Sequence, residues 1–580
     1  MLLGHTRLSI IDLSAAGHQP MHSPCRRYSI VFNGEIYNYR ELRKELLTLG
    51  QSFVSDSDTE VLLASWITWG ERCLHLLRGM FAFVVFDRKL GTLTCVRDAF
   101  GIKPFYFHEA NGTFLFASEI PALLATMQHR PALNMNRVYD YLVAGRYDYN
   151  TESFFKDISQ LAPGHVLTLR LHQVGKAATH RWWWPDILER NHISFEDATA
   201  QLRAMFLDNI RLHMRSDVSL GAALSGGVDS SAVVCAMRHV EPDMPIHTFS
   251  YVARESTYDE ESWADLVNKH VNAITHKVIV SPQELAQDLD DMIRVQGEPF
   301  GSTSIYAQYR VFKLARESGI TVTLDGQGAD EMLAGYNGYP GPTLHSLVEK
   351  RQWLAMMKFL QKWAQWPDRS IGAASKALIG EYTTKSLRSI SSRSFIHNPF
   401  PNWLNASYFD RQNIWMHQSM KSDNNADVKG RRLMAALRKS LTGDGLNGLL
   451  RHGDRNSMRW SVESRVPFLT NDIAEFLLSL PEDYLISKHG ETKHIFRAAM
   501  RGIVPDAILD RRDKVGFNTP EQAWLKQLGA QVYEWLDAAE NMPFLNARSC
   551  REEVTSILNG YKPFNFQAWR LINFCRWSQL

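Results

Sequence analysis

Several features that would point to particular protein classes are missing from this sequence of 580 residues. The six cysteines form no C-x-x-C pair and show no metal-ligand spacing, which argues against a zinc site or a disulfide framework. No apolar run reaches the roughly 20 residues of a membrane helix, and the N-terminus has no signal-peptide core. We therefore expect reduced thiols, a cytoplasmic protein and no membrane partner.

An excess of charge of one sign is also missing. The chain has 64 Lys and Arg residues against 62 Asp and Glu residues, a formal net charge of +2. Because no strong overall field results, we expect no nucleic-acid partner. Apolar residues at 45% and charged residues at 22% are typical of a globular protein. The length predicts at least two domains.

The first third of the chain shows short strand patterns separated by turns. Two helical patterns interrupt them, at Tyr39–Leu49 and Asp58–Trp69, and each ends before a glycine. We expect a buried strand around Leu8–Leu13 and another at Tyr28–Phe32. These signals predict an α+β layered domain with mainly antiparallel strands over residues 1–180.

From residue 195 onwards, strand patterns alternate with helical patterns. The predicted strands are unbroken and apolar: Val218–Leu224, His247–Val252, His276–Val280 and Ile320–Leu324. Such alternation predicts an α/β, doubly wound parallel sheet with helices on both faces, in a domain over residues 195–580 whose C-terminal part is helical. Ligands of these sheets bind at the carboxyl ends of the strands.

Two segments of the helical part are distinctive. Lys421–Arg432 is strongly polar and predicts an exposed loop. Lys350–Trp366 mixes basic residues with tryptophan and methionine, which occurs in helices that lie on a membrane or a partner. More often, such a helix packs its aromatic face on its own core, and we expect that here.

LSGGVDSS (Leu224–Ser231) lies between a predicted strand and a predicted helix, where backbone N–H groups and the helix dipole favour an anion. It has two glycines that allow close approach of a phosphate, hydroxyl donors and a carboxylate for Mg²⁺: Gly226, Gly227, Ser225, Ser230 and Asp229. The lysine of a Walker loop is absent, so the loop is not built to reach a γ-phosphate. A simple Gly/Ser turn is the alternative.

LDGQGADEMLAGY (Leu324–Tyr336) follows a second predicted strand. Asp325 and Gly326 leave the strand, and Asp330 opens a helix, where a carboxylate suits the dipole or a metal. An acidic first turn of an ordinary helix is the alternative. Because Asp229 lies at a neighbouring strand end, Asp229 and Asp330 together could hold the Mg²⁺ of MgATP.

With RNSMRWSVESRVPFL (Arg455–Leu469) and GETKHIFRAAMRGIVPDAILDRRDKVGF (Gly490–Phe517), these motifs follow one another as in glutamine-dependent asparagine synthetases, which the chain resembles over most of its length. The resemblance implies an ATP pyrophosphatase domain with ATP and Mg²⁺ as cofactors. It implies that aspartate is converted through β-aspartyl-AMP, with glutamine or ammonia as nitrogen donor, into asparagine, AMP and pyrophosphate.

The same resemblance assigns roles to individual residues. The implied ATP-binding residues are Leu224, Ser225, Gly226, Gly227, Asp229, Ser230, Tyr251, Asp325 and Gly326. Asp229 and Asp330 are implied metal ligands and catalytic residues. Lys514 is the implied catalytic lysine, and a point charge suits a departing pyrophosphate. A surface lysine in a charged run is the alternative for Lys514.

The first half resembles the glutaminase domain of that family, an N-terminal-nucleophile, class II amidotransferase fold. The motifs GHTRLSIIDL, NGEIYNY and SDTE carry the resemblance, and the implied glutamine-binding residues are Arg7, Asn33, Gly34, Glu35 and Asp58. Arg7 can pair with the α-carboxylate in a bidentate manner. Taken singly, Asn33-Gly34 would be a hairpin turn and Asp58 a helix cap.

That family uses an N-terminal cysteine whose α-amine assists its thiol, and no cysteine stands at this position. Cys25 is no substitute, because an internal cysteine has no free amine. We therefore expect the glutaminase domain to lack its first strands and doubt its glutaminase activity. Two explanations stay open: a start assigned too far downstream, which we favour because the glutamine-contacting residues persist, or a shortened chain that does not hydrolyse glutamine.

Departures from the family pattern keep other functions open. The best-known members have glutamate where this chain has Gln327, which cannot act as a base. EPFGSTSIY (Glu298–Tyr306) matches only part of the region expected to bind aspartate. The alternatives are an adenylating amidotransferase or cyclase for another carboxylate, such as a uronic acid, a lasso peptide or a β-lactam precursor, and an inactive paralogue. A homodimer is one option for the oligomeric state.

Overall fold

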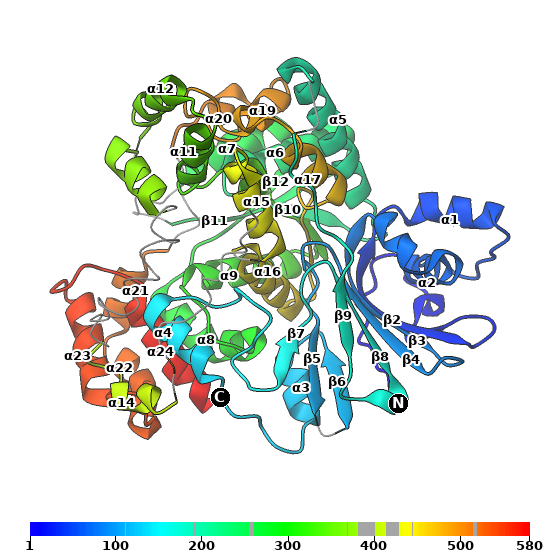
Figure 1. Ribbon diagram of the computed structural model, residues 1–580, viewed down its shortest axis with the longest axis horizontal. Helices are drawn as coiled ribbons and strands as arrows, with labels where there is room; N and C mark the ends of the chain where they lie inside the picture. Colours follow the sequence, from blue (N-terminus) through cyan, green and yellow to red (C-terminus); the bar gives the residue numbers. More distant parts are fainter. Residues whose placement is uncertain are drawn as a thin grey trace.

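The computed structural model describes residues 1–110, 112–189, 193–253, 260–367, 369–380, 401–412, 414, 428–443, 445–513 and 519–580. An antiparallel part, formed by the first third of the chain, lies beside a parallel sheet that is covered by helices (Figure 1). All six cysteines are free, and Cys25 is the exposed one. Within the described ranges, no helix is both long and apolar enough to cross a membrane.

The antiparallel part contains two sheets, and their strands pair antiparallel as the sequence pattern predicts. The six-stranded sheet has the order β1-β2-β3-β4-β8-β9: β1 (Met21–His22), β2 (Tyr28–Ile36), β3 (Gly79–Asp87), β4 (Thr92–Arg97), β8 (His165–Arg170) and β9 (Ala178–Arg181). The three-stranded sheet has the order β6-β5-β7: β5 (Tyr106–Ala110), β6 (Thr113–Ala117) and β7 (Ile158–Gln160). Helices α1 (Tyr39–Thr48) and α2 (Asp58–Trp69) follow β2 along the chain.

The prediction of a strand around Leu8–Leu13 is wrong, because this segment has no regular secondary structure. Ile10 and Ile11 are buried, but Leu13 is 56% exposed. The guanidinium group of Arg7 donates to backbone carbonyls of the same segment, at Ile11 and Ser14 among others. These bonds fold the segment back on itself, so the apolar residues pack as a loop.

The alternative of a hairpin turn at Asn33-Gly34 is also wrong, because β2 continues through both residues to Ile36. Asn33 pairs with Ala82 and Gly34 with Phe81 on β3. A Cβ on Gly34 would lie 2.0 Å from the carbonyl oxygen of Met80. Glycine therefore serves close strand pairing here and does not form a hairpin.

The third sheet, in the second half of the chain, is parallel throughout and has the order β12-β11-β10-β13-β14. Its strands are β10 (Leu220–Ala223), β11 (His247–Tyr251), β12 (Ile274–Val278), β13 (Val322–Leu324) and β14 (Glu463–Arg465). β10 comes first along the chain and lies in the middle, with β11 and β12 on one side and β13 on the other. The strand order therefore reverses between β10 and β13, and a ligand crevice is expected at such a switch point.

Helices cover both faces of this sheet (Figure 1). One layer contains α5 (Phe195–His213), α6 (Val228–Val240) and α7 (Glu261–Val271), and the other contains α8 (Pro282–Gln296), α9 (Ser304–Glu317) and α16 (Leu446–Arg459). The remaining α-helices that the structure describes with bounds are α3 (Ile120–Thr126), α4 (Met135–Ala144), α10 (Ala329–Leu333), α11 (Pro340–Glu349), α12 (Trp353–Trp363), α14 (Ala406–Asp410), α15 (Arg432–Thr442), α17 (Asn471–Leu478), α18 (Glu482–Leu485), α19 (His494–Ala499), α20 (Asp506–Leu509), α21 (Glu521–Leu528), α22 (Ala530–Leu536), α23 (Ala547–Leu558) and α24 (Gln567–Gln579).

The end of the polar segment Lys421–Arg432 is not an exposed loop. Residues 421–427 lie outside the described residues. Arg431 is buried, and its guanidinium group donates to the carbonyls of Leu478 and Leu480. Arg432 begins α15. Arg431 therefore satisfies buried carbonyls, which the sequence pattern does not reveal.

Candidate functional site

A glycine loop connects β10 to α6 at the switch point. The backbone N–H of Ser225 donates to the hydroxyl of Ser230 (3.2 Å), and that of Gly227 donates to the hydroxyl of Ser225 (3.3 Å). Gly226 has φ +83°, and a Cβ there would lie 2.7 Å from the Cβ of Trp263 on α7. The loop is thus held against α7 and leads directly into the N-terminus of α6, where a phosphate is favoured.

The loop after β13 packs against this glycine loop. A Cβ on Gly326 would lie 2.9 Å from the backbone nitrogen of Ser230 and 3.1 Å from the Cβ of Asp229. The neighbouring Asp325 donates its N–H to the carbonyl of Arg465 (2.8 Å) and accepts a hydrogen bond from the Ser464 hydroxyl. Burial raises the pKa of Asp325 to about 6.

Lys493 brings the two predicted metal ligands together. Its Nζ lies 2.6 Å and 2.5 Å from the two carboxylate oxygens of Asp229 and 2.8 Å from Oδ1 of Asp330. Burial lowers the pKa of Lys493, but these two carboxylates outweigh it, so the pKa lies above its usual value. Three charged groups from α6, α10 and the start of α19 therefore meet at one point.

Sequence reasoning missed Lys493, although the residue lies in the quoted motif GETKH. One feature of its position along the chain and one feature of its backbone are unusual. Lys493 precedes α19, and a cation at the start of a helix is disfavoured by the helix dipole. Its φ of +57° is also unusual for a residue other than glycine. A lysine in such a position indicates a role outside the helix.

Lys514, the predicted catalytic lysine, lies outside the described residues and stays a prediction. Arg511, shortly before it, donates to the carbonyl of Gly226 (2.9 Å) and pairs with Glu260 (2.8 Å). The described chain up to Asp513 therefore contacts the glycine loop.

Leu224 and Tyr251, the predicted neighbours of adenine, lie at the carboxyl ends of adjacent strands. Leu224 is buried, and its N–H donates to the carbonyl of Phe249 (2.9 Å). The Ser250 hydroxyl in turn donates to the carbonyl of Leu224 (2.7 Å). Tyr251 ends β11 and is half-buried. The structure therefore places the predicted ATP-binding residues along one edge of the sheet.

The protein supplies only some of the ligands that Mg²⁺ needs at this point. Within the part of the chain that the structure describes, no three His, Cys, Asp or Glu side chains gather as a metal cluster. Mg²⁺ is, however, usually bound by one or two carboxylates together with substrate phosphates. Asp229 and Asp330, which already share one cation on Lys493, provide those two carboxylates.

In the antiparallel part, Glu35 and Asp58 lie together in a buried position. Asp58 accepts a hydrogen bond from the N–H of Ile36 (2.9 Å). Burial and the neighbouring carboxyl groups raise the pKa of Glu35 well above its usual value, and burial raises that of Asp58 to about 6. Nη2 of Arg465 lies 3.5 Å from Oε2 of Glu35. This pair of carboxyl groups thus has a high affinity for positive charge.

The other predicted glutamine-binding residues are arranged differently. Asn33 donates its side-chain amide to the hydroxyl of Ser118 (3.1 Å), and Gly34 follows it on β2. Arg7 uses its guanidinium group for carbonyls of its own segment, including that of Ser14 (2.9 Å). The structure therefore brings Glu35 and Asp58 together, whereas the side chains of Arg7 and Asn33 have other partners.

Side chains from β14 and α16 contact the glutamine-binding candidates directly or through one further residue. Arg465 at the end of β14 places its side chain beside Glu35, while its carbonyl accepts the N–H of Asp325. Arg455 on α16 donates to the carbonyl of Ser118 (2.5 Å), whose hydroxyl binds Asn33. Arg465 is therefore a direct link between Glu35, a glutamine-binding candidate, and Asp325, a nucleotide-binding candidate.

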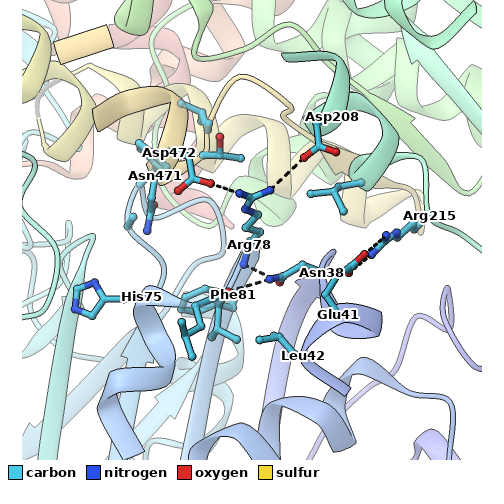
Figure 2. A pocket seen from close by; sticks show the side chains of 18 of the residues that line it. Asn38, Glu41, Leu42, His75, Arg78, Phe81, Asp208, Arg215, Asn471 and Asp472 are labelled. Carbon is cyan, nitrogen blue, oxygen red and sulfur yellow. Dashed lines mark hydrogen bonds and ion pairs between the residues drawn. The ribbon is translucent and has the colours of Figure 1, made fainter. Parts of the chain in front are cut away.

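A cavity of about 530 Å³ lies at the junction of the two parts, and none of the predicted site residues is among its lining. Figure 2 shows Arg78 of the antiparallel part projecting between Asp208 and Asp472 of the second half. The pairs measure 3.2 Å and 2.6 Å. Arg215 forms a further pair with Glu41 across the junction (2.5 Å). These ion pairs bridge the two parts at the rim of the cavity.

Comparison with known proteins adds an independent finding. Residues 201–579 match the model of the family described as asparagine synthase, and residues 1–183 match that of the glutamine amidotransferase domain. Asparagine synthetase [glutamine-hydrolyzing] 3 of Bacillus subtilis is 30% identical over 552 residues, covering 92% of this chain and 82% of the relative.

Two further relatives extend this result. Asparagine synthetase [glutamine-hydrolyzing] 1 of Bacillus subtilis is 30% identical over 540 residues, with 92% of this chain and 82% of the relative covered. Amidase chyE of Penicillium rubens is 25% identical over 613 residues, covering 97% and 88%. Since one family model matches well over half of its residues, this chain belongs to the asparagine synthase family.

Proposed function

We propose that this chain is an ATP-dependent ligase that adenylates the side-chain carboxylate of aspartate and transfers it to ammonia, forming asparagine. The observation that carries the proposal is Lys493 held between Asp229 and Asp330 where the loops after β10 and β13 meet. The glutamine-hydrolysing asparagine synthetases among the relatives support aspartate as the acceptor.

In this proposal, the loop after β10 and the N-terminus of α6 bind the phosphates of ATP. Asp229 and Asp330 would hold Mg²⁺, which supplies charge neutralisation to the departing pyrophosphate. Lys493 adds a further positive charge at the same point and supports negative charge on the phosphate oxygens. Lys514 stays a second candidate for that role.

The proposed chemistry has two steps. A carboxylate oxygen of aspartate attacks the α-phosphorus, and the bond from that phosphorus to the bridging oxygen breaks, which gives β-aspartyl-AMP and pyrophosphate. Ammonia then attacks the acyl carbon, AMP leaves with its oxygen, and the nitrogen loses a proton. Both steps transfer groups without any change of oxidation state, so ATP is the only energy source required.

For the antiparallel part, we propose a site that binds glutamine. Glu35 and Asp58 would bind the α-ammonium group, because a cation relieves the cost of ionising two buried carboxyl groups. Arg7 would bind the α-carboxylate in place of the carbonyls that it contacts here. Asn33 and the backbone of Gly34 would bind the side-chain amide oxygen.

The test is the exchange of labelled pyrophosphate into ATP, which reports adenylation without the nitrogen donor. Exchange that requires aspartate supports the proposal, as does formation of AMP and asparagine after ammonium is added. Release of ADP and orthophosphate would contradict it. Exchange that depends on another carboxylic acid would identify a different acceptor, and failure to bind MgATP would indicate an inactive paralogue.

A further inference from the structure

The N-terminal end of α12 exposes an apolar tip that the proposed reaction does not use. We define the tip as Trp353, Leu354 and Met357, which are 55%, 81% and 53% exposed. Their spacing puts them on one side of the helix. The expectation that the aromatic face of Lys350–Trp366 packs on the core is therefore correct for only part of the segment.

The C-terminal half of α12 holds the tip in place. Phe359, Leu360 and Trp363 are buried in the main hydrophobic core. Arg369 lies over the ring of Trp363, 3.8 Å from its centroid. Figure 1 shows α12 at the edge of the molecule, on the side away from the antiparallel part. The tip is thus the exposed end of a helix whose other end packs in the core.

The charges along the segment that contains the tip are of one sign. The exposed cations of the segment are Lys350, Arg351, Lys358 and Lys362, and no acidic residue occurs from residue 350 to residue 367. Beyond α12, Arg369 and Arg512 both lie over the ring of Trp366, at 4.9 Å and 5.3 Å. For a chain whose overall net charge is +2, this is a local concentration of positive charge.

We propose that the tip of α12 and its cations attach the protein to a membrane surface that contains anionic lipids. An exposed Trp, Leu and Met set enters the boundary between headgroups and acyl chains, and the surrounding Lys and Arg side chains meet the anionic headgroups. The attachment is peripheral and reversible. It requires no membrane-crossing helix, and it departs from the expectation of no membrane partner that composition alone favours.

The test is flotation of the full-length protein with vesicles of phosphatidylcholine alone or with about 30% phosphatidylglycerol. Wild type is expected to float with the anionic vesicles, to lose this binding in about 0.5 M salt, and to stay unbound with neutral vesicles. Trp353→Ser/Leu354→Ser/Met357→Ser and, separately, Lys358→Glu/Lys362→Glu should each reduce the bound fraction about tenfold.

The matched control is Val54→Ser/Leu90→Ser, which removes two apolar side chains, 91% and 61% exposed, from the antiparallel part. It should bind vesicles like wild type. Equal loss in this control, equal binding to neutral vesicles, or no binding by wild type would overturn the proposal. A tip variant that changes only the oligomeric state, measured by light scattering, would instead identify a contact between two copies. Aspartate-dependent pyrophosphate exchange should be unchanged in both α12 variants.

Discussion

Substitution of Lys493 by methionine tests the central geometry of the candidate site. Lys493→Met keeps most of the length of the side chain but removes the ammonium group between Asp229 and Asp330. Removing one partner of a buried ion pair costs about 3–5 kcal/mol. The carboxylates keep 21% and 18% side-chain exposure, and water relieves part of this cost. We therefore expect a loss of about 2–3 kcal/mol in the unfolding free energy without Mg²⁺.

The activity of the Lys493→Met variant should also fall. Loss of one preorganised charge donor commonly reduces kcat by about 10²–10³, and we expect this for aspartate-dependent pyrophosphate exchange in Lys493→Met. Mg²⁺ should raise the melting temperature of the variant more than that of wild type, because two carboxylates without their lysine bind a cation more strongly.

The control variant is Lys488→Met on the same segment, where Lys488 is 83% exposed and pairs with Asp483 at 3.2 Å. An exposed pair contributes little, so stability and exchange should stay at the wild-type level. The reasoning is refuted if Lys493→Met retains wild-type exchange. It is also refuted if Lys488→Met loses as much activity as Lys493→Met.

Three further predictions follow from charged groups elsewhere. Because the pKa of Asp325 is about 6, pyrophosphate exchange should increase as the pH rises through about 6. Asp325→Asn should remove this inflection from the pH profile. An inflection that persists in the variant would belong to another group. The pKa of Asp58 is also about 6, above its unfolded value near 4, so its contribution to stability is present below about pH 4 and is lost as the pH rises to about 6. Asp58→Asn should reduce this fall in unfolding free energy between about pH 4 and about pH 6, as measured by urea titrations. An unchanged fall would contradict the assignment to Asp58. Lys103→Met breaks a buried pair with Asp454 and should lower the unfolding free energy by about 3–5 kcal/mol. Arg78→Met should lower it by less than about 1 kcal/mol, because the Arg78 side chain is 43% exposed. Calorimetry that ranks the two variants in reverse would contradict the burial argument.

The elements of the three sheets could largely be predicted from the sequence, because local signals determine them. Helix α2 (Asp58–Trp69) has the predicted bounds, and β11 (His247–Tyr251) is one residue shorter than predicted; both depend on apolar patterning. The errors occur where tertiary pairing overrides a local preference. Gly34 pairs within β2 against β3 although Asn-Gly favours a turn, and Leu8–Leu13 packs as a loop.

The candidate site was predictable to the extent that strand ends meet at one edge of a parallel sheet. Asp229 and Asp330 could be placed near each other on that basis. Lys493 could not, because it meets Asp229 from 264 residues further along the chain. Lys103 and Asp454 are 351 residues apart, and nothing in either local sequence indicates the other. Partners of this kind are determined by the packing of whole elements and not by local pattern.

Gln327 stands where the best-known members of the family have glutamate. This difference leads to a last prediction, which concerns the second step of the proposed reaction. Oε1 of Gln327 lies 3.4 Å from the position that a Cβ on Gly453 would take, so the amide faces α16. An amide cannot accept the proton that ammonia must lose, whereas a carboxylate can. Gln327→Glu should therefore increase the yield of amide per pyrophosphate released at low ammonium concentration.

The matched variant is Gln327→Met, which has a similar length but can neither accept that proton nor form the hydrogen bonds of an amide. It should lower the yield of amide per pyrophosphate while leaving aspartate-dependent exchange unchanged, because exchange precedes the attack of ammonia. If both variants reduce exchange and amide formation by the same factor, Gln327 acts in nucleotide binding and not in the ammonia step. An effect confined to amide formation would place the capture of ammonia at the junction of β13 and α16, beside the route that links Asp325 to Glu35 through Arg465.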